Sequence, residues 1–187
     1  MLGSFYAIAD VKLRSLVIDF AGRSLHNTSG AVPLEALERL KNFWTSRFEA
    51  VRGTETIGEQ VEELTSFGWW FVSKKFSDEW SIDQLFEVLK VTQKIEPEHL
   101  VLERLAELSA SVPARAVECL ALIVEGDREG WSILGRRGHV RTIIATAINS
   151  ADEKARRHAA TLVHHLGTRG NFEFRDLLPP NLPSLKV

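Results

Sequence analysis

The chain has little of several residue types that would point to particular classes of protein. A single cysteine, Cys119, excludes an internal disulfide, and its apolar neighbours favour a buried, reduced thiol. Six prolines and twelve glycines in 187 residues argue against a loop-rich β fold and against a disordered chain. A formal net charge of −2 gives the whole molecule no strong attraction to nucleic acid or to an acidic membrane surface.

Long apolar runs are missing too. No stretch reaches the roughly 18–20 apolar residues that a membrane-spanning helix needs. The charges of Asp10, Lys12 and Arg14 interrupt any apolar core that a signal peptide would require. We therefore expect a cytoplasmic location and no membrane association.

The sequence motifs of common enzymes are not found. There is no phosphate-binding loop, no dinucleotide fingerprint, no H-E-x-x-H and no G-x-S-x-G. The spacing of Gly135 and Gly138 around two arginines is similar to that of a KH loop, but the strands of that fold are not predicted. His158 and His165 share a helix face two turns apart, without the i, i+4 spacing typical of metal ligands. We expect no catalytic residues, no metal and no cofactor.

Helical periodicity dominates the sequence. Apolar residues recur at spacings of three and four along most of the chain, which predicts an all-α fold of about eight or nine helices. One of these helices is expected to run from Thr56 through the aromatic stretch Trp69–Phe71 toward Phe76, and a short helical piece covers Trp131–Leu134. First-turn prolines and capping boxes predict helix starts at Pro33, Thr56, Ser81, Pro113 and Ser150.

A weak internal repeat has a period near 40 residues. When residues 101–123 are shifted by 40, they lie over residues 141–163 with the apolar positions in register. That period lies in the range of HEAT and armadillo repeats. The segment 152–162, with its acidic turn, arginines and small residues before Leu162, resembles the second helix of a HEAT repeat. The resemblance covers about residues 81–170 and implies stacked antiparallel helical hairpins, a HEAT-like α-α superhelix.

The expected organisation is a single helical domain over residues 1–187. It comprises N-terminal helices in residues 1–80, HEAT-like hairpins in residues 81–178 and an extended tail in residues 179–187. The arrangement from Trp69-Trp70 to Phe174–Leu178 is also similar to C-terminal helical regions of large bacterial proteins of unclear role.

Charge is distributed unevenly along the second half. Residues 136–175 contain eight Lys and Arg against three Asp and Glu, whereas residues 96–129 contain three against eight. Three interpretations fit this pattern. In the simplest, the charges cover an ordinary solvated surface. Alternatively, they form a basic face that binds phosphates, or a dipolar face that orients a protein partner. The candidate contact residues are Arg136, Arg137, Arg141, Arg156, Arg157 and Arg169.

Two adjacent tryptophans form a second candidate. Trp69 and Trp70 are about 100° apart on a helix, so they cannot both lie on one narrow apolar stripe. One of them packs in a second layer or lies at an interface, where tryptophan often dominates the binding energy.

The sequence thus predicts a non-enzymatic protein-interaction module that binds a protein partner or further copies of itself. The alternative is a nucleic-acid-binding helical repeat that uses the basic face. Base-excision enzymes with HEAT-like repeats need a tryptophan and an aspartate around a flipped base. In this chain the corresponding residues would be Trp131 together with either Asp127 or Asp152.

Overall fold

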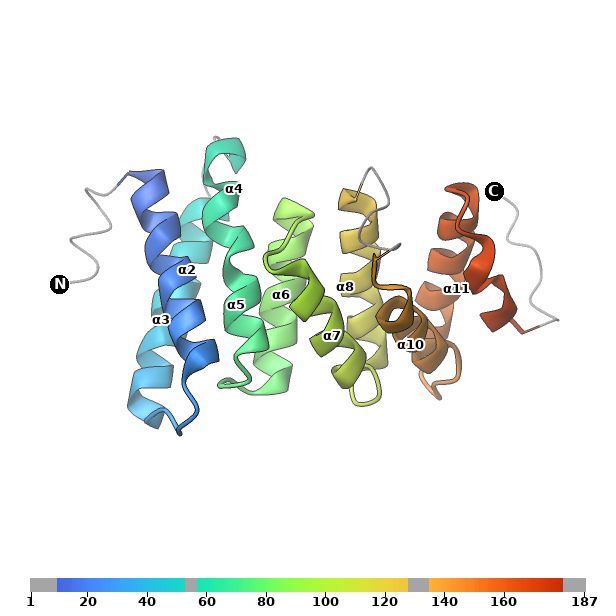
Figure 1. Ribbon diagram of the computed structural model, residues 1–187, viewed down its shortest axis with the longest axis horizontal. Coiled ribbons are helices and arrows are strands. Elements are labelled where there is room, and N and C mark those ends of the chain that lie inside the picture. The colour runs from blue at the N-terminus through green and yellow to red at the C-terminus, as the bar shows by residue number, and fades with distance from the viewer. Residues whose placement is uncertain (1–9, 53–56, 128–134, 180–187) are drawn as a thin grey trace.

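The computed structural model describes residues 10–52, 57–127 and 135–179, with side chains except at 57–60. These residues form nine α-helices and one 3-10 helix and no strand, which confirms the all-α fold. The helices stand side by side along the long axis, from α2 and α3 at one end to α11 at the other (Figure 1). Their bounds are α2 (Val11–Asn27), α3 (Leu34–Arg52), α4 (Ile57–Thr65), α5 (Phe67–Val72), α6 (Asp78–Thr92), α7 (Glu98–Leu108), α8 (Pro113–Gly126), α10 (Arg137–Ile148), α11 (Glu153–Thr168) and η1 (Phe172–Leu177).

The helices pack in two layers. In one layer α2 contacts α5, α5 contacts α7, and α7 contacts α10; in the other α4 contacts α6, α6 contacts α8, and α8 contacts α11. Each of the pairs α5–α6, α7–α8 and α10–α11 packs across the layers. The buried apolar side chains form one cluster from Ile18 in α2 to Phe174 in η1. α8 also packs against α6 and α7, and α11 packs against α10 and η1, so these neighbours hold α8 and α11 in place relative to each other.

Two predicted helix starts agree with the structure, and a third helix has a side-chain cap that was not predicted. α8 begins at Pro113, and α3 begins directly after Pro33. The first helix begins after Asp10, whose carboxylate accepts a hydrogen bond from the Leu13 amide at 2.7 Å.

Two predicted capping boxes are wrong, and a third lies outside the described residues. α6 begins at Asp78 rather than at Ser81, which is buried one turn into the helix. α11 begins at Glu153 and is capped by Asp152, whose carboxylate accepts the Lys154 amide at 2.8 Å. At α11 an aspartate thus caps the helix in place of the serine, whereas α6 has Ser77 at its N-cap position and Asp78 and Glu79 in its first turn, where carboxylates interact favourably with the helix dipole. Thr56 and the piece Trp131–Leu134 belong to the undescribed segments.

The continuous helix predicted up to Phe76 is interrupted at Ser66. In an α-helix the Thr65 carbonyl would accept the Trp69 amide, but here it accepts the Glu96 amide at 2.9 Å. The Trp69 amide instead donates to Ser66 at 3.2 Å. The loop before α7 thus ends α4 at Thr65, and α5 starts at Phe67.

An ionic cluster joins the turn before α6 to α7. Glu107 accepts from Lys74 Nζ at 2.8 Å and from Arg104 Nη1 at 2.7 Å, while Arg104 Nη2 reaches Asp78 at 2.6 Å. The hydrogen bonds from Lys74 and Arg104 hold the pKa of the Glu107 carboxyl below its ordinary value of 4.5.

Replacing Glu107 with glutamine is expected to lower the free energy of unfolding at neutral pH by less than about 1 kcal/mol, because solvent screens this half-exposed cluster. A lowered folded-state pKa means that the stabilisation is complete above 4.5 and disappears as the pH falls through the lowered value. Urea unfolding at a series of pH values should show the two proteins converging below that pH. A difference that stays constant down to about pH 2 would contradict this assignment.

Candidate functional site

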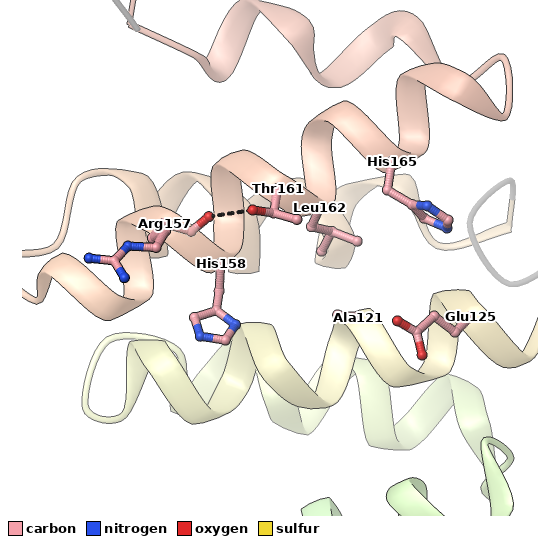
Figure 2. A pocket seen from close by; sticks show the side chains of 7 residues that line it. All are labelled: Ala121, Glu125, Arg157, His158, Thr161, Leu162 and His165. Atoms are coloured by element: carbon pink, nitrogen blue, oxygen red, sulfur yellow. Dashed lines mark hydrogen bonds between the residues drawn. The ribbon is translucent and has the colours of Figure 1, made fainter. Parts of the chain in front are cut away.

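A groove runs between α8 and α11 (Figure 2). Its volume is about 330 Å³, and two residues of α8 and five of α11 line it: Ala121, Glu125, Arg157, His158, Thr161, Leu162 and His165. The residues from α11 recur at spacings of three and four, which places them on one face of the helix. Two helix faces that are far apart in the sequence thus form the site.

The groove has an apolar floor and a polar rim. Leu162 is only 3% exposed and belongs to the core beneath the groove. Ala121 ends at its Cβ atom, so α8 leaves the space beside it unfilled. Glu125, Arg157 and His165 are exposed along the edges. The groove can therefore accept an apolar side chain of a ligand. The ligand residues next to that side chain would then contact the acidic and basic groups of the rim.

The two histidines predicted to share a helix face do so. Figure 2 shows His158 extending from α11 toward α8, His165 projecting from a later turn of α11, and Glu125 lying along α8. The Thr161 hydroxyl donates to the Arg157 carbonyl at 3.0 Å, so its proton is engaged within the helix. His164, the third histidine of this segment, is exposed and does not line the groove.

A nearly buried carboxylate ties the two helices together beside the groove. Glu118 of α8 accepts from Lys154 Nζ at 2.7 Å and lies 3.6 Å from Nε2 of His158, both on α11. It also accepts from Arg115 Nη1 at 2.9 Å. Arg115 in turn reaches Asp83 of α6 at 2.9 Å. These contacts fix the separation of α8 and α11, and they place one end of the groove against a compensated charge cluster.

Nucleophilic groups near the groove are occupied or inaccessible. Cys119 follows Glu118 directly but is fully buried, and burial raises the pKa of its thiol well above the ordinary range. Within the part of the chain that the structure describes, no three His, Cys, Asp or Glu side chains are placed to hold a metal ion.

The six candidate arginines do not converge on one face. Arg137 pairs with Glu173 at 3.2 Å, and Arg141 pairs with Asp176. The Arg141 hydrogen bond holds the pKa of the Asp176 carboxyl below its ordinary value. Both arginines therefore direct their charge at η1.

The other four arginines have separate surroundings. Arg156 donates to the Ser150 and Ala151 carbonyls at 2.7 and 2.9 Å, and Arg169 donates to the Val124 carbonyl at 2.5 Å and to the Asp127 carbonyl. Arg136 is exposed before α10. Arg157 pairs with Glu153 at 2.7 Å and alone among the six lines the groove.

Trp69 and Trp70 lie in different environments, as their separation of about 100° around the helix requires. Trp70 is fully buried, and its indole N–H donates to the Ile18 carbonyl at 3.0 Å. Trp70 is therefore not available to a partner, which corrects its place among the contact candidates. Trp69 is partly buried under Arg23, whose guanidinium lies 4.2 Å from the ring centre, and it contacts His26. Trp70 packs instead with Trp44 and Phe76 in the core.

Sequence reasoning did not find most of the groove. Ala121 and Glu125 belong to no motif, and the HEAT-like segment that contains Thr161 and Leu162 does not assign them to a surface, because the groove depends on which faces of α8 and α11 meet. Two features of the sequence pointed to the groove: the shared helix face of His158 and His165, and the small residue Ala121 within the apolar stripe of α8.

Comparison of the chain with protein-family models, with curated proteins and with solved structures finds no match. Among the described helices, none has the length and apolar character needed to cross a membrane.

Proposed function

We propose that this protein is a non-enzymatic protein-interaction module and that the α8–α11 groove is its contact surface. The observation that carries the proposal is the combination of an apolar floor at Leu162 and Ala121 with a rim of both charge signs. Partner-binding surfaces commonly have this composition, an apolar centre within a polar edge. The resemblance to HEAT-like repeats adds support, because stacked hairpins present extended surfaces to partners.

The chemistry beside the groove also favours binding over catalysis. Covalent catalysis with His158 as the base, next to Glu118, would need a nucleophilic side chain within hydrogen-bond reach. The Thr161 hydroxyl is bonded to its own helix, and Cys119 is buried. We extend the proposal to a cytoplasmic location, which a lone reduced thiol supports.

Nucleic-acid binding is less well supported as the function. Phosphate binding needs several cations that converge on one surface. The candidate arginines are divided among η1, the start of α11 and the end of α8, and three of them pair with carboxylates: Arg137, Arg141 and Arg157. A gel shift at low salt tests this alternative, since phosphate contacts are strongest there.

Filling the groove is expected to abolish partner binding. In the variant Ala121→Arg a long charged side chain would occupy the floor, and we expect recovery of the partner to fall at least about tenfold. The measurement is affinity purification from the native cells, with mass spectrometry to quantify the proteins retained.

The matched control is Ala50→Arg, the same substitution at an exposed position of α3. Ala50→Arg should retain the partner at the wild-type level, and both variants should melt within a few degrees of the wild type. If Ala121→Arg folds and retains its partner, the groove is not the contact surface.

A further inference from the structure

The outer face of α2 carries an apolar stripe that no other described residue covers. Leu13, Leu16 and Phe20 are 41, 56 and 73% exposed, and their spacing of three and four puts them on one side of the helix. The opposite side buries Ile18 and Leu25 against the row. This end of the row lies far from the α8–α11 groove (Figure 1).

Such a stripe is unusual at the end of a helical stack. Terminal helices in stacked-hairpin proteins normally have a polar outer face, because nothing follows them. Phe20 alone leaves most of a large aromatic surface in water. An apolar helix face of this kind calls for a second helix to cover it.

We propose that the stripe is the interface of a homodimer in which α2 packs antiparallel against α2 of a second copy. A two-fold axis between Leu16 and Val17 places Leu13 of each copy against Phe20 of the other. The same patch then serves both copies, as a two-fold interface requires. The proposal is independent of the partner groove.

The charges beside the stripe favour the antiparallel arrangement. Arg23 lies thirteen residues after Asp10, and the same axis brings Arg23 of each copy opposite Asp10 of the other. The Arg23 side chain is 51% exposed and pairs with Asp19 of its own helix at 2.6 Å, and Asp10 is exposed with one carboxylate oxygen accepting the Leu13 amide, so Asp10 of the second copy would join an existing ion pair. A parallel pairing would instead oppose Arg23 with Arg23 and Lys12 with Lys12, which is repulsive.

Sedimentation velocity tests the proposal on the full chain. The interface is small, so we expect a dissociation constant on the order of 10 µM and a dimer of twice 21.0 kDa at about 0.2 mM. Phe20→Glu should give a monomer at the same concentration. Phe172→Glu, the matched change at an exposed phenylalanine on η1, should remain a dimer.

Cysteine cross-linking tests the orientation. Cys119 is fully buried, so an introduced thiol is the reactive one. A mixture of Leu13→Cys and Phe20→Cys proteins, carrying tags of different size, should form a disulfide heterodimer, whereas either protein alone should form little. A wild type that stays monomeric at about 0.2 mM, because another part of the chain or a different protein covers the stripe, would overturn the proposal. Equally efficient cross-linking of Leu13→Cys alone would overturn it as well.

Discussion

Replacing Gly126 with alanine should destabilise the protein by about 3 kcal/mol or more, which makes it one of the two largest effects expected here. A Cβ atom at this position would lie 1.8 Å from the carbonyl oxygen of Gln93 and 2.8 Å from its carbonyl carbon. These are backbone atoms at the end of α6, so no side-chain rotation can relieve the overlap. The end of α8, which carries Glu125 of the groove, would have to move away. Urea unfolding followed by circular dichroism measures the loss.

Gly138→Ala is the matched control for this change. Gly138 also lies in a helix, α10, but a Cβ atom there would meet nothing within 4 Å. Alanine should therefore stabilise the protein by up to about 1 kcal/mol through helix propensity alone. Similar unfolding curves for the two variants would contradict the close approach of α8 to the loop before α7.

Replacing Glu63 with leucine should cost about 3 kcal/mol, the second large effect. Glu63 is completely buried in α4. It accepts from Arg47 of α3 through Nε at 2.8 Å and through Nη2 at 3.2 Å, and it lies 3.4 Å from Nε of Arg14 in α2. The substitution deprives both poorly exposed guanidinium groups of the carboxylate that they share. The free energy of unfolding, again from urea titration, gives the size of the effect.

Two comparisons separate this cause from a general effect of leucine. Glu35→Leu removes an exposed ion pair with Arg39 and should change stability by no more than about 0.5 kcal/mol. The triple variant Arg14→Met, Arg47→Met, Glu63→Leu replaces all three charges with apolar groups and should recover most of the loss. If the single and triple variants are equally unstable, the missing carboxylate is not the cause.

The helices were predictable because their signals are local. The apolar periodicity places Trp44 and Phe48 in the core, and the first-turn prolines place the starts of α3 and α8 within one residue. The 100° between Trp69 and Trp70 correctly required that their environments differ, but it could not say which ring is buried. The hydrogen bond from Trp70 to Ile18 decides that, and it joins residues 52 positions apart.

The groove and the helix break were not predictable because they depend on long-range contacts. Whether α4 continues past Ser66 depends on the Glu96 amide, which takes the Thr65 carbonyl. Whether Arg169 faces solvent depends on the carbonyls at the end of α8, to which it donates. The excess of Lys and Arg in residues 136–175 likewise does not translate directly into a basic surface, because ion pairs such as Arg141–Asp176 form between elements.

Photo-cross-linking inside the groove tests the central claim most directly. A photoreactive phenylalanine analogue placed at Thr161, which is exposed on the groove wall, should give one dominant cross-linked adduct in the native cells. The adduct should be absent when the analogue is placed at Ala50, and it should disappear when Thr161 is probed in the Ala121→Arg background. Equal adducts from both positions, or a Thr161 adduct that survives Ala121→Arg, would contradict the assignment of the α8–α11 groove as the partner-binding surface.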